Sequence, residues 1–183
     1  LSSSSAASDV YKRQPEYTGD GTLVLEPTYK HIILLDLDEW GNSIVLDDGL
    51  FLACESTLKQ KAVRRKTFSS AFVGGEGFFN LGLKGSGVVC IESDCSREEL
   101  VEITLEDDVV KIDGNLAIAW SGSLDFTVER AGKSLLGSAA SGEGLVNVYR
   151  GTGKVLLAPV GNQAMKPQQV IEKEPVIVGD DDE

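Results

Sequence analysis

The chain has 183 residues, of which 42% are hydrophobic and 25% are charged, and its formal net charge is −12. This composition is typical of a globular protein with its own core, and the negative charge disfavours binding to phosphate backbones. Three cysteines do not form the even-numbered disulfide framework of a small secreted domain, so we expect a reducing, intracellular location. No apolar run approaches the roughly 20 residues of a membrane-spanning helix.

The first fourteen residues, LSSSSAASDVYKRQ, are rich in serine and alanine and do not begin with methionine. They fit a targeting segment with basic residues at its end or, in the interpretation that we favour, adapter sequence joined to a truncated reading frame. We therefore predict a non-native or disordered leader over 1–14 and a folded domain over 15–160 that is incomplete at its N-terminus. The last segment, 161–183, is predicted to be a disordered acidic tail.

Pairs of glycines recur every 66 residues. Gly19-Asp20-Gly21, Gly85-Ser86-Gly87 and Gly151-Thr152-Gly153 each precede a short apolar run. Within segments 48–53 and 115–119, Leu50 matches Leu116 and Ala53 matches Ala119 with the same offset. Segment 74–80 matches 141–147 with an offset of 67, which one inserted residue explains. Since no G-E-G segment precedes the first glycine pair, we expect a further repeat unit upstream.

Each repeat reads as short strands separated by turn residues. Runs of four to seven residues with apolar alternation predict strands at 32–37, 43–46, 50–54, 100–105, 109–112, 116–120 and 124–129. The pattern predicts an all-β fold, an antiparallel β-sandwich or jelly-roll-like double-stranded β-helix built from pseudo-repeats. The glycine pairs are expected at bulges or hairpin corners, and Trp120 in the core or an interface.

Alternation also assigns the faces of the last predicted strand. Leu124, Phe126 and Val128 are expected to face the core, whereas their neighbours Asp125, Thr127 and Glu129 are expected to face solvent.

No combination of side chains indicates catalysis. The single histidine, His31, lies in a predicted strand, and Cys90 and Cys95 lack the second pair that a zinc site needs. The glycine-rich loop 82–87 is not followed by a helix, so it does not predict phosphate binding. We expect no catalytic, cofactor-binding or metal-binding residues.

Two sets of residues are candidates for an interface or an anion site. The first is a basic cluster, Lys59, Lys61, Arg64, Arg65 and Lys66, which either forms a solvated face or binds acidic lipid or nucleic acid. The second surrounds the equivalent G-E-G turns and consists of Glu76, Phe78, Phe79 and Glu143. The two glutamates could act as a general acid and base. We favour the interpretation that each glutamate accepts hydrogen bonds from backbone N–H groups or contacts a partner subunit. The phenylalanines would suit a subunit interface.

The segments DDGLFLACES, GGEGFFNLGLKGSGVV, IDGNLAIAWSGSLDFTVER and SGEGLVNVYRGTGKVLLAPV occur in this order. Over residues 18–160 the chain resembles the altered inheritance of mitochondria protein 24 family, whose bacterial members are called TRAP-like proteins of unknown function. The resemblance implies a double-stranded β-helix sandwich with pseudo-repeats, assembly into trimers, and a link to the organisation of the mitochondrial inner membrane. It supplies no catalytic residues.

We therefore expect a non-enzymatic assembly or scaffold protein without a cofactor, located in mitochondria or otherwise in the cytoplasm. Its expected partners are further copies of itself, in a trimer or another homo-oligomer, and a protein or membrane surface. Two alternatives stay open: nucleic-acid binding through the basic cluster, which the acidic body disfavours, and a small-ligand pocket inside the sandwich.

Overall fold

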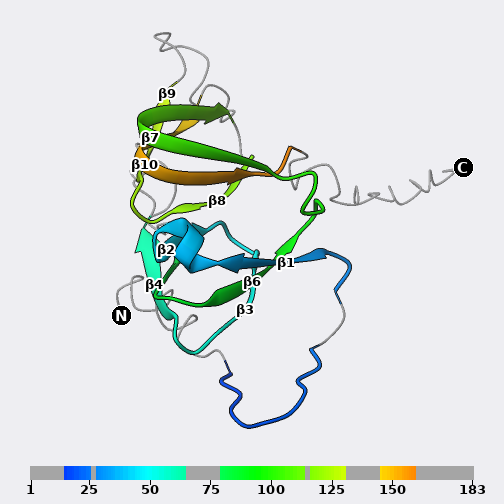
Figure 1. The fold of residues 1–183 in the computed structure, drawn as a ribbon. Helices are drawn as coiled ribbons and strands as arrows, with labels where there is room; N and C mark the ends of the chain where they lie inside the picture. Colours follow the sequence, from blue (N-terminus) through cyan, green and yellow to red (C-terminus); the bar gives the residue numbers. More distant parts are fainter. Residues whose placement is uncertain (1–14, 26–27, 65–78, 114–115, 131–144, 160–183) are drawn as a thin grey trace, which may run out of the picture.

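The computed structural model describes residues 15–25, 28–64, 79–113, 116–130 and 145–159. The predicted leader and acidic tail lie outside these residues. The described part of the chain is all-β, with antiparallel strands and one short 3₁₀ helix, as the sequence predicts at this level. Figure 1 shows two groups of strands stacked on one another.

We call the lower group unit 1, residues 31–93, and the upper group unit 2, residues 101–159. Unit 1 consists of β1 (His31–Asp36), the 3₁₀ helix η1 (Leu37–Trp40), β2 (Ser43–Leu46), β3 (Phe51–Cys54), β4 (Lys59–Arg64), β5 (Phe79–Lys84) and β6 (Val88–Ser93). Unit 2 consists of β7 (Val101–Asp113), β8 (Ala117–Ser121), β9 (Asp125–Arg130) and β10 (Leu145–Leu157).

Strand pairing repeats between the units with the 66-residue offset. In unit 1, Cys90 of β6 lies opposite Ala53 of β3, and in unit 2, Leu156 of β10 lies opposite Ala119 of β8. Both of these ladders carry a register shift at the same place. Likewise, β4 pairs with β5 as β9 pairs with β10. The sequence repeat is therefore a repeat of hydrogen-bonded structure.

The structure corrects one part of the sequence alignment. Pairing with β4 places Val63 opposite Asn80, and pairing with β9 places Glu129 opposite Val146. Asn80 is thus equivalent to Val146, not to Asn147 as the offset of 67 predicts. The reason is that cross-strand pairing, and not the identity of one asparagine, sets the register of a strand.

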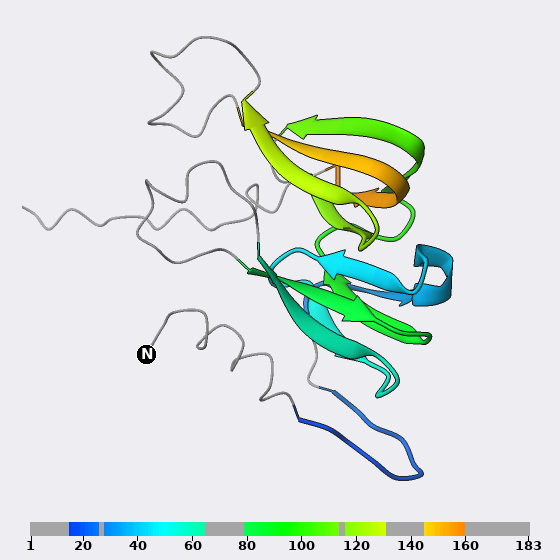
Figure 2. The same cartoon turned by 90° about the vertical axis from the view of Figure 1, so that its left-hand side faces the viewer.

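Two sheets carry the fold. A three-stranded sheet has the order β1-β6-β3, and a seven-stranded sheet has the order β4-β5-β2-β8-β10-β7, with β9 also paired to β10. The larger sheet crosses from unit 1 to unit 2 where β2 pairs with β8, and it is strongly curled in the side view (Figure 2).

The glycine pairs occupy the two kinds of site that the sequence predicts. Gly85 and Gly87, with φ of 139° and 143°, form the corner between β5 and β6. Gly151 and Gly153, with φ of 116° and 157°, form the bulge at which β10 shifts its register against β7. Residues without glycine's freedom rarely adopt these values.

The turn after β1 differs from the prediction. Leu37, expected at the end of a strand, instead begins η1, whose first turn is capped by the Asp36 carboxylate accepting from Asp38 N at 3.0 Å. In unit 2 the chain turns in fewer residues, so the two predicted strands 100–105 and 109–112 are parts of one strand, β7. Because of the longer turn, β1 is offset by 68 residues from its counterpart in β7.

The core has two clusters. The first fills unit 1 and includes residues of unit 2, among them Ile118, Ala119 and Leu156. The second lies in unit 2 around Trp120 and Tyr149, so the prediction that Trp120 belongs to the core is confirmed. Phe126 packs on this second cluster as predicted. Glu129 and Thr127, expected in solvent, are half-buried, because Arg150 of β10 contacts both side chains.

Candidate functional site

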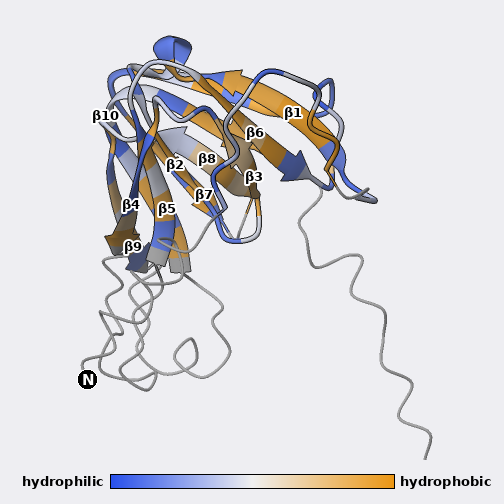
Figure 3. Ribbon diagram, turned by 90° about the horizontal axis from the view of Figure 1, so that it is seen from below, coloured by the Kyte–Doolittle hydropathy of each residue, from blue (hydrophilic) through white to orange (hydrophobic). Residues whose placement is uncertain are grey.

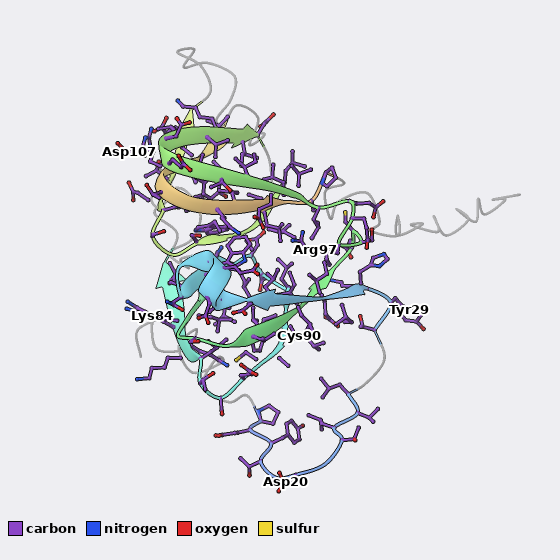
Figure 4. The ribbon with its side chains drawn as sticks, viewed as in Figure 1. Asp20, Tyr29, Lys84, Cys90, Arg97 and Asp107 are labelled. Atoms are coloured by element: carbon purple, nitrogen blue, oxygen red, sulfur yellow. The ribbon has the colours of Figure 1, made fainter. Side chains whose placement is uncertain are left out.

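The outer face of the three-stranded sheet is apolar and open. Along β1, Ile33 and Leu35 face the core, whereas Ile32 and Leu34 on the opposite face are 49% and 68% exposed. Leu34 lies opposite Cys90 of β6, and Ala53 of β3 lies on the other side of Cys90. Viewed from below, β1 and β6 are largely hydrophobic (Figure 3), and Cys90 lies near the centre of this region (Figure 4).

Unit 2 has an equivalent face, and most of that face is covered, although Glu102, the counterpart of Leu34, stays exposed. Leu156 and Ala119, the counterparts of Cys90 and Ala53, are fully buried in the first core cluster. Leu100, the counterpart of Ile32, is 8% exposed and belongs to the same cluster. The inner face of unit 1 therefore covers the outer face of unit 2. The ammonium of Lys154 adds a contact 5.7 Å from the ring of Trp40 in unit 1.

Two strand edges are open at equivalent places. The units are joined by β2 and β8, which pair Val45 with Trp120 and Leu46 with Ala119. The counterpart of β2 is segment 109–112 of β7, and the counterpart of β8 is β3. Each of these strands pairs on one side only among the described residues and ends its sheet. One end of the molecule thus carries the counterpart of β2 with an unpaired edge, and the other end carries the counterpart of β8 with an unpaired edge.

The basic cluster is only partly described. Lys59 and Lys61 are exposed side chains on β4. Arg64 ends this strand, and only its backbone is described; Arg65 and Lys66 lie outside the described residues. Neither Lys59 nor Lys61 forms an ion pair with a described residue.

The residues around the G-E-G turns contribute little to the described structure. Phe79 begins β5, where only its backbone is described. Glu76, Phe78 and Glu143 lie outside the described residues, so their predicted roles stay predictions.

Sequence reasoning missed Ile32 and Leu34. The available signal was the uninterrupted run Ile32–Leu35, since a strand that is apolar on both faces is typically buried on both.

The thiols on or beside the open face are unreactive in character. Burial raises the pKa of Cys90, and the nearby Glu92 carboxylate raises it further. Burial also raises the pKa of Cys54. A hydrogen bond from Gln60 lowers this pKa and so partly offsets the effect of burial, whereas the Glu55 carboxylate raises it further. A raised pKa keeps both thiols protonated at neutral pH, so they act here as small apolar side chains.

Other chemistry is not indicated by the described residues. They contain no group of three or more His, Cys, Asp or Glu side chains arranged to hold a metal ion. Among the same residues, no helix has the length and apolar character needed to cross a membrane.

Together these features define an all-β repeat protein whose successive units pack inner face to outer face. The model of the family described as Mitochondrial biogenesis AIM24 matches residues 2–160, and the chain belongs to this family. The resemblance seen in the sequence motifs is thereby confirmed.

Two bacterial relatives are similar to this chain. It is 32% identical over 140 residues to an uncharacterized protein of Streptococcus pyogenes serotype M6, a match that covers 76% of this chain and 54% of the relative. The crystal structure of protein SPYM3_0169 from Streptococcus pyogenes is similar with a TM-score of 0.55 and 29% identity, covering 73% of this chain and 56% of that one. The chain spans about half the length of the relatives it matches.

Proposed function

We propose that this protein is a non-enzymatic assembly module, which associates by stacking its repeat units head to tail. The observation that carries the proposal is the β2–β8 junction, whose two halves recur as free strands at opposite ends of the molecule. A further unit of the same fold could dock at either end as unit 1 docks on unit 2. For the chain in hand, a second copy supplies that unit.

The repeat specifies the register of the new contact. In the junction, Ile44 pairs with Ser121, Val45 with Trp120 and Leu46 with Ala119. Moving each residue to its counterpart pairs Val110 of one copy with Glu55 of the next, Lys111 with Cys54, and Ile112 with Ala53. Free strand edges are natural sites for such pairing.

The apolar face supports the same arrangement. Docking would bury Ile32, which is 49% exposed in a single chain, and Cys90 beneath the inner face of another unit, as Leu100 and Leu156 are buried in unit 2. Burying apolar surface contributes about 25 cal/mol per Å². Because the contact is heterologous, repeated docking closes into a ring or extends into a filament. A ring of units would complete the sandwich of double-stranded β-helix type expected from the sequence, with a trimer as the expected homo-oligomer.

We extend the proposal to a cellular role. The family description, Mitochondrial biogenesis AIM24, supports a mitochondrial location, and the resemblance described above implies a scaffold role in inner-membrane organisation, with a protein or membrane surface as the partner of the assembly. This location and these partners are part of the proposal.

Cross-linking through the predicted register tests the assembly. Lys111→Cys places a thiol opposite Cys54 of the next copy, and oxidation should give disulfide-linked species larger than a dimer on a non-reducing gel. Such a ladder distinguishes head-to-tail contacts from a two-fold dimer, since a symmetric contact cannot extend beyond two chains. The matched control, Lys111→Cys with Cys54→Ser, should lose the ladder.

Light scattering on the unmodified chain provides the second measurement. A molecular mass above that of a monomer, lowered by Ile32→Asp, would support the proposal. A strict monomer at high concentration that also gives no cross-linked ladder would refute it, because both free edges and the apolar face are then unused.

A further inference from the structure

A cavity of about 370 Å³ opens beside the junction of β2 and β8. Its described lining comes from both units: Ser43, Val45, Lys61, Val63, Asn80, Gly82, Leu83, Lys84, Trp120, Gly122, Leu124, Asp125 and Phe126. This volume lies in the range of small-molecule sites.

Asn80 is the most informative residue of this cavity. Its side chain is 98% buried, since the residue is 2% exposed, and its Nδ2 has no hydrogen-bond partner among the described residues. A buried donor without an acceptor is costly, and in native proteins it calls for an explanation. An acceptor supplied by a bound molecule provides one.

Two ammonium groups belong to the same site. Strand alternation places Asn80, Gly82 and Lys84 on one face of β5, and Lys61 lies opposite Gly82 on β4. Figure 4 shows Lys84 at the end of β5, beside β4. Lys84 also lies directly opposite Lys59, an arrangement of like charges that is unfavourable by itself. Neither Lys61 nor Lys84 forms an ion pair with a described residue.

Unit 2 shows the same face without these features. Arg150, the counterpart of Lys84, contacts the Glu129 carboxylate and donates to Thr127 Oγ1 at 3.1 Å. Lys111 also pairs with Glu129 at 3.1 Å. In unit 1 the counterpart of Glu129 is Val63, so the cations of unit 1 lack the carboxylate that neutralises those of unit 2.

The repeat also shows how the space in unit 1 arises. The counterpart of Asn80 is the apolar Val146, and the counterpart of Gly82 is Val148, which is fully buried. Above Gly82 the Val63 side chain fills the place of the missing side chain, since a Cβ on Gly82 would lie 2.7 Å from Val63 Cγ2. The cavity of unit 1 therefore arises where Asn80 replaces Val146, and where no ion pair like that of Arg150 with Glu129 forms among the described residues.

The remaining wall is mostly apolar, and Ser43, Gly122 and the carboxylate-bearing Asp125 complete it. Trp120 and Phe126, with ring centroids 5.1 Å apart, face the cavity together with Leu124 and Val45. Aromatic rings of this kind pack against a flat apolar or aromatic body.

We propose that this cavity is a binding site for a small organic carboxylate with an apolar body. The carboxylate would lie between Lys61 and Lys84, and it would accept the N–H of Asn80 once this buried amide turns toward the cavity, while the body would contact Trp120 and Phe126. Inorganic anions would bind weakly, because they leave the aromatic wall unused.

The test measures binding of three carboxylates, phenylacetate, benzoate and hexanoate, by calorimetry and by the shift of the Asn80 side-chain amide signal in NMR. Phenylacetamide and phenethylamine replace the carboxylate of phenylacetate with a neutral and a cationic group, and inorganic phosphate lacks the apolar body. We expect at least one carboxylate to bind and to shift the Asn80 signal, with the neutral and cationic analogues and phosphate all weaker.

Two variants locate the site. Asn80→Val, which installs the residue found in unit 2, and Lys84→Met should each weaken binding about tenfold or more, the loss expected for a hydrogen bond to a charged group. Asn80→Val should not lower the melting temperature, since it removes an unpaired buried donor. Lys30→Met, which changes a half-buried cation that pairs with Asp94 outside the cavity, should bind as the unmodified protein does.

Three results would overturn the inference: no binding of any of the three carboxylates, equal binding of phenylacetate and its amine analogue, or unchanged affinity in Lys84→Met. Because Lys84 is exposed, Lys84→Met should fold. This variant therefore keeps the test decisive if Asn80→Val fails to fold.

Discussion

Val45 of β2 lies directly opposite Trp120 of β8, and this pair joins the two repeat units within one sheet. Both side chains are buried, and Trp120 also contacts Phe126 and Tyr149, with ring centroids 5.1 Å and 5.3 Å away. A residue of unit 1 thus completes the core of unit 2. The same pair borders the cavity, so the junction positions both features that we assign a function.

Trp120→Ala should destabilise the fold strongly. Removing a buried aromatic side chain costs about 3–5 kcal/mol of unfolding free energy, and here Phe126 and Tyr149 both lose their contact with the Trp120 ring. Urea denaturation followed by far-UV circular dichroism measures the loss. Trp120→Phe, which keeps an aromatic ring, should lose clearly less; a loss in Trp120→Ala below about 1 kcal/mol would show that this cluster does not hold the junction.

Gly85→Ala should cost more stability than Gly49→Ala. Both glycines have positive φ, 139° and 76°, but only at Gly85 would a Cβ lie 2.8 Å from a backbone oxygen, that of Thr57. The backbone strain alone costs about 1–3 kcal/mol, and the collision adds to it at Gly85. Thermal denaturation of the two variants side by side gives the difference, and equal losses would mean that the hairpin corner relaxes freely.

Glu129 should make the stability of unit 2 depend on pH. Its hydrogen bond with Arg150, and then that with Lys111, hold the pKa of its carboxyl below the ordinary value. A depressed pKa stabilises the folded state above the ordinary value, and this stabilisation is lost as the pH falls through the folded-state pKa.

Glu129→Gln tests this dependence. The variant should unfold at lower urea concentration than the unmodified chain at pH 7, and the gap should narrow on acidification below about pH 5. Glu98 and Glu99, whose pKa values are also lowered, are present in both proteins and cancel in the comparison. A gap that is independent of pH would contradict the ionic role.

Cys54 and Cys90 should react slowly with iodoacetamide at pH 7.5. Burial raises the pKa of both thiols, and the thiolate is the reactive form. Mass spectrometry of native protein should show slower alkylation than in a cysteine-containing peptide, with the difference shrinking as the pH rises past the peptide's own pKa. Rates equal to that of the peptide at pH 7.5 would rule out the desolvated environment.

The sequence predicted the strands well because their causes are local. Ser43–Leu46 is a strand with the predicted bounds, and the glycine pairs lie at a hairpin corner and a bulge because positive φ is a property of the residue itself. The short helix η1 was missed, since four residues held by one aspartate cap resemble the end of a strand. The candidate site was predicted less well: of the basic cluster, Lys61 lines the cavity, whereas Asn80 gave no signal because a polar residue in a strand usually faces solvent.

By itself, then, the sequence determined the all-β class, the 66-residue period, the positions of most strands and the family. Only the tertiary structure decided which of two equivalent residues is covered. Cys90 and Leu156 occupy the same place in the repeat, yet Cys90 is partly exposed and Leu156 is fully buried. The physical reason is that alternation and turn chemistry act within a strand, whereas burial depends on the neighbour that packs against it, and in this chain only one of the two units has that neighbour.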